Sequence, residues 1–299
     1  MGTYQCSVVM VQYNPIWENV KRTLDSIIRQ TNCKFEIVVA DDGSKENFSE
    51  QLKEYFHNHK FEDYQLVMNG VNGGTVKNVI SGIEVSTGKY VRAIAPGDFL
   101  YAEDTLSKIV AFMEEHQAKE MFGRLAYYEL KGEEMQMISK QVPFDLTPYQ
   151  EHNVNRIKEH LTLLGDNISG ASYTWEREYY LECLRRIEGS VIYLEDCVSL
   201  CTVYDGHQIH FMDEYVTWYE YGTGISTSKS RRWAEILARD WISFYEIMLQ
   251  RYPRDRKIKK AKQYYELSLK GFASNKLWKN ILFAKRYFYS RNASRKTRG

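Results

Sequence analysis

Acidic side chains follow two of the strands that the first hundred residues predict. Asp41 and Asp42 come directly after the run of residues 35–40, and Asp98 follows the run of residues 89–95. Short runs rich in Val and Ile, bounded by Gly, Pro and Asp, are typical of buried parallel strands. Ligands of open α/β sheets lie outside the carboxyl ends of the strands. These acids can therefore converge on one polar ligand, and a phosphate-bearing ligand would need a cation between them.

The segment Asp41-Asp42-Gly43-Ser44 also has a simpler interpretation. Asp, Gly and Ser favour ordinary turns and helix caps, so the segment alone leaves both interpretations open.

The elements that must position these acids alternate along the chain. Strands are predicted at 7–13, 35–40, 64–68 and 89–95, and helices at 16–30, 46–58 and 75–86. This alternation predicts an α/β fold with a doubly wound, mostly parallel sheet. Later segments predict helices at 101–117, 175–187 and 195–203, and strands at 121–130, 190–194 and 207–219. From Arg231 onward the pattern is helical throughout.

Composition indicates an ordinary globular protein. Of its 299 residues, 43% are hydrophobic and 26% are charged, and no run approaches the ~18 apolar residues of a membrane span. The first residues enter a strand at once without a secretory signal pattern, which predicts a cytoplasmic location. The five cysteines are scattered, which favours core or partly buried thiols over a metal site.

Charge is divided unevenly along the chain. Residues 251–299 contain 16 Lys and Arg against two acids, a net charge of +14, so the remainder carries −13. Aromatic residues alternate with these cations, which predicts contact with an anionic membrane surface at its inner, cytoplasmic face. Nucleic acid is not expected as a partner, since no recognition motif accompanies the basic residues. A second interpretation is a helical appendage that packs its aromatic side chains on the core.

Five motifs occur in order along the chain: Ser7 to Asn14, Asp41-Asp42-Gly43-Ser44, Asn72-Gly73-Gly74 with Asn78, Pro96-Gly97-Asp98, and Glu195-Asp196. Together they resemble those of family 2 glycosyltransferases with the GT-A fold. The resemblance covers about residues 5–200 and is closest to bacterial members that build polysaccharides. It implies a GT-A domain over 1–225, with a nucleotide-binding half at 1–100 and an acceptor half at 101–225, and a basic helical region at 226–299.

The resemblance assigns the nucleotide contacts to the first half. Tyr13 and Asp42 would hold the base, with Asp42 accepting a hydrogen bond from a uracil imide. Lys77 would meet the diphosphate, which a helix N-terminus also favours. Structural alternatives are that Tyr13 closes the core at a strand end and that Lys77 is an exposed lysine without a ligand.

The resemblance also implies a divalent cation, Mn²⁺ or Mg²⁺, held by Asp98. Gly97 stands where the family's motif has its first acid, in the part of the site that contacts the nucleotide's diphosphate. One protein carboxylate can suffice, because phosphates and waters fill the other positions. The departure also leaves open a weaker metal site, a metal-free enzyme or an inactive relative.

Catalysis is assigned by the resemblance to the second half. Asp196 would be the base catalyst of an inverting transfer, and Glu195 would orient it or contact the acceptor. The alternative is an acidic pair that merely opens a helix. Asp166 or Asn167 would contact sugar hydroxyls, and Gly170 would let the backbone approach closely.

The expected function is the transfer of a single sugar from a nucleotide-sugar donor, a UDP-sugar, to a saccharide or lipid-linked saccharide acceptor. Residues 229–233 are similar in part to the Gln-any-any-Arg-Trp motif of processive members, but Lys229 replaces Gln, and we interpret this as coincidence. One alternative is a catalytically inactive sugar-nucleotide-binding or scaffold subunit, which Gly97 would favour. Another is a sugar-nucleotide nucleotidyltransferase, but residues 14–17 lack the glycine-rich basic loop that it would need.

Overall fold

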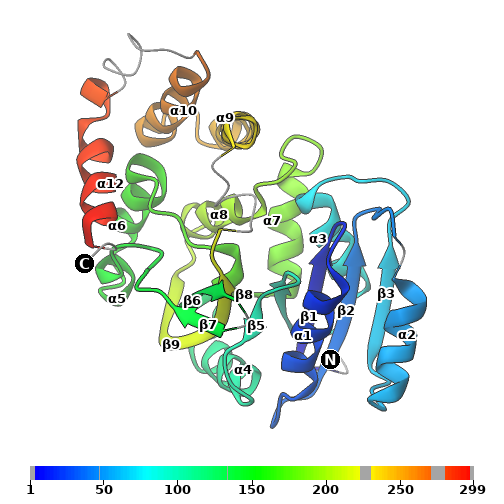
Figure 1. Ribbon diagram of the computed structural model, residues 1–299. Coiled ribbons are helices and arrows are strands. Elements are labelled where there is room, and N and C mark those ends of the chain that lie inside the picture. Colours follow the sequence, from blue (N-terminus) through cyan, green and yellow to red (C-terminus); the bar gives the residue numbers. More distant parts are fainter. Residues whose placement is uncertain (1–3, 47, 133, 223–229, 271–279, 297–299) are drawn as a thin grey trace.

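The first half of the sheet is parallel, as the alternating pattern predicts. The computed structural model describes residues 4–46, 48–132, 134–222, 230–270 and 280–296. Strands in this half run in the order β3-β2-β1-β4, and every neighbouring pair is parallel. Their bounds are β1 Cys6–Gln12, β2 Phe35–Asp41, β3 Tyr64–Met68 and β4 Tyr90–Ile94. The carboxyl ends of β1, β2 and β4 therefore lie at one edge of the sheet, and the predicted acids follow the ends of β2 and β4. β1, β2 and β3 lie side by side in Figure 1.

Both faces of this parallel sheet are covered by helices. Val8 and Met10 point into one buried cluster while Val9, between them, points into another, as strand alternation requires. Helices α1 Trp17–Ile28, α2 Ser49–Asn58 and α4 Thr105–His116 contribute to the first cluster, and α3 Thr75–Val85 and α7 Arg177–Ile187 to the second. The doubly wound α/β fold is thus confirmed.

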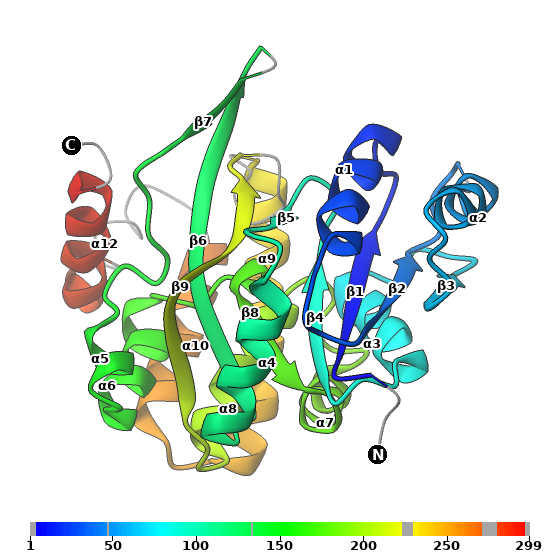
Figure 2. The same ribbon diagram turned by 90° about the horizontal axis from the view of Figure 1, so that it is seen from below.

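The second half of the sheet is mixed. β8 Tyr173–Glu176 pairs antiparallel with β4 and with β6 Glu120–Lys131. β9 Ile209–Glu220 runs parallel to β6 and antiparallel to the short β5 Phe99–Leu100. β7 Glu134–Met137 pairs with the end of β6 in a long hairpin that extends from the body (Figure 2). Parallel pairing is therefore concentrated in the first half of the sheet, with β6 and β9 the parallel pair of the second half.

The predicted strand at 190–194 is wrong, and three strands, β5, β7 and β8, were not predicted. Residues 190–194 form no strand, because backbone groups of this segment bond to α3 and to a later helix. β8 escaped prediction because four residues are too few for periodicity to be read. The predicted helix at 195–203 is a 3₁₀ turn, Glu195–Val198, that continues into α8 Ser199–Tyr204.

The C-terminal region is helical, as predicted, and packs on the rest of the chain. Trp241, Phe244 and Tyr245 of α9 are buried in the same cluster as Val198 and Cys201. The remaining helical elements are α5 Thr147–Gln150, α6 Val154–Glu159, the π-helical turn His160–Leu164, the 3₁₀ turn Gly170–Ser172, α9 Arg231–Arg251, α10 Arg256–Leu269 and α12 Ala284–Lys296. α12 lies beside α5 and α6 in both views (Figures 1 and 2). Among the described residues, no helix is both long and apolar enough to cross a membrane.

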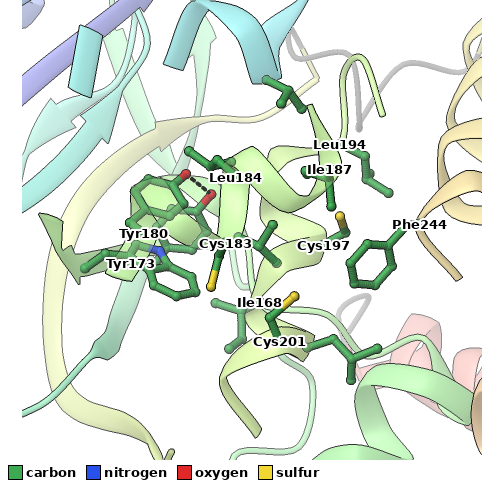
Figure 3. Close-up of a cluster of buried hydrophobic side chains, with 14 of the residues drawn as sticks. Ile168, Tyr173, Tyr180, Cys183, Leu184, Ile187, Leu194, Cys197, Cys201 and Phe244 are labelled. Carbon is green, nitrogen blue, oxygen red and sulfur yellow. Dashed lines mark hydrogen bonds between the residues drawn. The ribbon is translucent and has the colours of Figure 1, made fainter. Parts of the chain in front are cut away.

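The cysteines lie where the core prediction puts them. Cys183, Cys197 and Cys201 gather with Leu194 and Phe244 in one buried cluster (Figure 3). Cys6 is also buried, and Cys33 is partly buried.

Candidate functional site

Asp42 fixes the glycine-rich loop that precedes α3. Its Oδ1 accepts a hydrogen bond from the backbone N–H of Gly73 (2.8 Å) and its Oδ2 from that of Gly74 (2.9 Å). Burial raises the pKa of the Asp42 carboxyl, and these two N–H groups counteract the shift. Each carboxylate oxygen can accept a second hydrogen bond, so this structural role is compatible with the expected contact to the base.

Tyr13 stands beside Asp42 with its side chain open to solvent. It directly follows β1 and is 51% exposed, so it does not close the core, which was the alternative interpretation. The turn around it is tied to β2: the N–H of Asn14 donates to Ser44 Oγ, and Ser44 Oγ donates to Asp41. An exposed aromatic ring on a fixed turn can stack on a nucleotide base.

Lys77 lies next to the loop that Asp42 holds. It is exposed in the first turn of α3, and its side chain covers Gly73, because a Cβ on Gly73 would lie 2.5 Å from Lys77 Cδ. Its charge also lowers the pKa of Asp42, although burial outweighs it. The ammonium group of Lys77 and the positive end of the α3 dipole together form a suitable environment for phosphate.

Gly97 and Asp98 form a rigid turn at the end of β4. Thr23 Oγ1 accepts from the N–H of Gly97 (3.0 Å) and donates to the carbonyl of Asp98 (2.8 Å). The hydroxyl of Tyr128 donates to the carbonyl of Gly97 (2.7 Å). Asp98 is buried, and Oδ1 accepts from the N–H of Glu220 at 3.4 Å.

Asp98 is the buried acid of this turn, and charged groups surround it. Burial raises the pKa of Asp98 to about 8; the Glu220 carboxylate adds to this rise, and the Arg92 guanidinium opposes it. In the described part of the chain, no three His, Cys, Asp or Glu side chains are grouped as a metal site. A cation here would therefore need oxygen atoms from the phosphates of a bound nucleotide in addition to Asp98, which is how Mg²⁺ usually binds at nucleotide sites. The buried carboxylate at this edge fits that arrangement.

Arg92 was not identified from the sequence, yet its side chain joins the strands next to the Gly97-Asp98 turn. It is fully buried in β4, and burial lowers the pKa of its guanidinium to about 10. The guanidinium donates to the carbonyls of Ala171 and Tyr173 and to the hydroxyls of Thr174 and Thr217. It thereby joins β4 to β8 and β9, and its positive charge lies near Asp98.

Glu195 and Asp196 open the 3₁₀ turn before α8 and are held from both sides. Leu194 and Cys197, their flanking residues, are anchored in the core (Figure 3). The two acids themselves remain partly exposed. Burial raises the pKa of both carboxyls, and the charge of Asp196 raises that of Glu195 further. A base with a pKa raised toward neutrality accepts a proton more readily than an ordinary carboxylate.

A buried glutamate holds the helix that follows these acids. Glu120 of β6 accepts from Ser199 Oγ (2.6 Å) and from Thr202 Oγ1 (2.5 Å), both in α8. Burial raises the pKa of Glu120 to about 8, and the two hydroxyl donors oppose the shift.

The segment before Glu195 connects the two halves of the site. The carbonyl of Ile192 accepts from the N–H of Val76 in α3 (3.0 Å). The N–H groups of Ile192 (3.2 Å) and Tyr193 (2.7 Å) donate to Asp240 of α9. The glycine-rich loop before α3, the turn with the predicted base catalyst and α9 thus form one contact chain; no sequence motif pointed to Asp240.

The loop at 166–170 divides into two environments. A Cβ on Gly170 would lie 2.9 Å from Glu195 Oε1, so the backbone approaches the acid closely, as expected. Asp166 is instead buried and accepts from the N–H of Phe144 (2.7 Å) and the hydroxyl of Tyr289 in α12 (2.5 Å). The side chain of Asn167 is partly exposed.

Part of the 229–233 segment also reaches the site. The ring of Trp233 packs edge-on against that of Tyr193, with centroids 5.0 Å apart. Tyr193 lies two residues before Glu195, so Trp233 borders the predicted catalytic turn; Lys229 lies outside the described residues.

Known proteins share both this sequence pattern and this fold. The family model for glycosyl transferase family 2 matches residues 7–178. An uncharacterized glycosyltransferase of Haemophilus influenzae is 23% identical over 204 residues, 66% of this chain and 78% of that protein. A PGL/p-HBAD biosynthesis glycosyltransferase of Mycobacterium bovis is 32% identical over 105 residues, 33% of this chain and 38% of its own length.

Solved structures agree on the fold. The mannosyltransferase PcManGT from Pyrobaculum calidifontis, in complex with GDP-Man and Mn²⁺, has a TM-score of 0.58 at 17% identity, covering 97% of this chain and 76% of its own. TarS of S. aureus in complex with UDP has a TM-score of 0.51 at 16% identity, covering 98% and 91%. The family match extends over more than half of the chain and includes the strand-end acids described above. The chain belongs to glycosyl transferase family 2 and has the GT-A fold.

Proposed function

We propose that this protein is an inverting, cation-dependent glycosyltransferase of cell-surface polysaccharide synthesis. It transfers a single sugar from a UDP-sugar to a saccharide or lipid-linked saccharide acceptor. The observation that carries the proposal is the contact chain from Asp42 through Gly74 and Ile192 to the Glu195-Asp196 turn. It brings a nucleotide-binding loop and a candidate base into one site.

The donor would bind across the carboxyl ends of β1 and β2. Tyr13 would stack on the base, Asp42 would accept from its imide, and Lys77 would face the diphosphate beside the N-terminus of α3. UDP is the nucleotide bound to TarS, and UDP-GlcNAc is bound to it in a second complex, which supports a uridine donor.

Asp98 would hold the cation, Mn²⁺ or Mg²⁺, beside Gly97. When bound, the cation would stabilise the negative charge on the leaving diphosphate. Mn²⁺ accompanies GDP-Man in PcManGT, which supports this assignment.

Asp196 would act as the base. It would take the proton of the acceptor hydroxyl while that oxygen forms a bond to the anomeric carbon from the face opposite the diphosphate. The bond between the anomeric carbon and the diphosphate oxygen breaks in the same displacement, so the configuration inverts. Glu195 would orient Asp196 or the acceptor. Asn167, which is partly exposed, is the proposed sugar-side residue of the neighbouring loop, because the Asp166 carboxylate is buried and accepts hydrogen bonds from Phe144 and Tyr289.

The acceptor's location would explain the basic C-terminal region. Ile281, Leu282 and Phe288 are exposed by 56%, 49% and 60%, and they lie among the cations of residues 251–299. Exposed apolar and basic groups together favour the anionic inner face of a membrane. A cytoplasmic enzyme would meet a lipid-linked acceptor there.

Calorimetry of UDP binding tests the donor site. We expect UDP to bind wild-type protein more tightly with Mn²⁺ than with EDTA, and we expect Asp98→Ala to abolish this difference. Glu103→Ala, an exposed acid five residues away, serves as the control and retains it. No UDP binding under either condition would overturn the uridine assignment.

A further inference from the structure

We infer that Glu220 supplies a second carboxylate to the cation site, in the place that Gly97 leaves without one. This inference rests on the cation-dependent function proposed above. It adds a ligand from the far end of the acceptor half, 122 residues after Asp98.

Strand pairing places Gly97 and Glu220 opposite each other. β5 and β9 are antiparallel, with Leu100 facing Thr217 and Phe99 facing Trp218. Continued by two residues, the same register sets Gly97 against Glu220. The N–H of Glu220 donates to Oδ1 of Asp98 at 3.4 Å, so the end of β9 does reach the turn.

The Glu220 carboxylate lies where a side chain at position 97 would project. A Cβ built on Gly97 would lie 3.2 Å from Glu220 Oε2 and 3.6 Å from Asn19 Nδ2. The φ of Gly97 is +104°, a conformation that disfavours any residue with a side chain. An acid is therefore disfavoured at position 97 itself, while an acid from the neighbouring strand fills the same space.

Charge explains why an acid here implies a cation. Asp98 and Glu220 together carry up to two negative charges at the edge where the diphosphate of the donor would bind. Without a cation they would repel it, whereas Mg²⁺ or Mn²⁺ between the carboxylates and the phosphates would convert the repulsion into attraction. Magnesium sites at nucleotides are commonly built from one or two carboxylates plus phosphate oxygens.

This charge argument gives the Glu220→Gln variant a signature that a purely structural role would not have. We expect it to bind Mn²⁺ in the presence of UDP at least about tenfold more weakly than wild type, because one anionic ligand is lost. In EDTA, we expect it to bind UDP as tightly as wild type or more tightly, because a repelling charge is removed. Electron paramagnetic resonance of free Mn²⁺ and calorimetry of UDP measure the two quantities.

The matched control is Glu129→Gln. Glu129 is an exposed glutamate on β6, next to Tyr128, which pairs with Glu220. It should leave both affinities unchanged, and all variants should give wild-type circular dichroism.

Two outcomes contradict the inference in different ways. If wild type binds Mn²⁺ with UDP and Glu220→Gln binds it equally well, or loses UDP affinity equally with and without Mn²⁺, Glu220 is not a ligand and the proposed function stands. If wild type with UDP binds no Mn²⁺ at all, the cation-dependent function fails and the inference fails with it.

Discussion

The backbone carbonyl of Ile192 accepts a hydrogen bond from the N–H of Val76, at 3.0 Å. Val76 lies in the first turn of α3, directly after the loop that Asp42 holds, and Ile192 lies three residues before Glu195. A single hydrogen bond thus joins the nucleotide side of the site to the turn that carries the proposed base. Asp240 holds the same segment from the other side through the N–H groups of Ile192 and Tyr193.

Replacing Asp240 should impair turnover more than donor binding. Asp240→Ala leaves two N–H groups without their acceptor, which costs roughly 1–3 kcal/mol each where they stay buried, so the segment should shift. Misplacement of a catalytic group by about 1 Å can lower a rate about a hundredfold. We expect kcat for UDP release to fall by about that factor and UDP affinity to change less than about twofold.

Glu235→Ala is the control for this variant, since Glu235 is an exposed acid on the same helix, where it pairs with Arg231 one turn away. Equal losses of kcat and of UDP affinity in Asp240→Ala would contradict a role in positioning the catalytic turn.

Glu120 should make stability depend on pH. Its pKa is about 8 in the folded protein because of burial, against 4.5 for an exposed glutamate. Between these values the unfolded chain has released the proton while the folded protein keeps it, so stability falls as pH rises. The free energy of unfolding should decrease by at most about 1.4 kcal/mol per pH unit for this group.

Glu120→Gln removes this titration and keeps a side chain of the same size. Glu120 titrates at about 4.5 in the unfolded chain and at about 8 in the folded protein. Between about pH 5 and about pH 8, the free energy of unfolding measured with urea should therefore fall less steeply in Glu120→Gln than in wild type. Glu115→Gln, at an exposed position, should keep the wild-type slope. The same slope in Glu120→Gln and wild type would show that Glu120 is already ionised in the folded protein.

The C-terminal surface should bind anionic membranes. We expect wild type to sediment with vesicles that contain phosphatidylglycerol, less so as salt screens the basic residues. Phe288→Ser removes an exposed apolar side chain of α12 and should weaken this binding several-fold. Leu130→Ser, an exposed apolar side chain of β6, is the control. Vesicle binding that neither salt nor Phe288→Ser weakens would argue against this surface.

The sequence predicted what is local to a strand and its following turn. Asp42 and Asp98 were identified because they lie in the turns after strands with a clear apolar pattern, and the parallel half of the sheet places these strand ends together. Tyr13 was identified from the family resemblance, and the scattered spacing of the cysteines predicted that they are core or partly buried thiols.

What the sequence missed depends on contacts between distant segments. Glu220 faces Gly97 only because β9 pairs with β5, and Asp240 is at the site only because α9 packs on residues 192–193. Asp166 was predicted to contact sugar hydroxyls because it lies in a loop. It is buried instead, and its carboxylate accepts a hydrogen bond from the hydroxyl of Tyr289, far along the chain. No local pattern contains these pairings.

The most direct test of the central claim compares wild type with Asp196→Asn. UDP release from a panel of UDP-sugars, with membrane extract as the acceptor source, measures turnover, and calorimetry measures UDP binding. We predict that wild type turns over at least one donor and that Asp196→Asn loses at least about a hundredfold in rate while binding UDP as before. UDP binding without turnover in either protein would contradict the claim and favour the inactive scaffold subunit; turnover at the wild-type rate in Asp196→Asn would show that another group is the base.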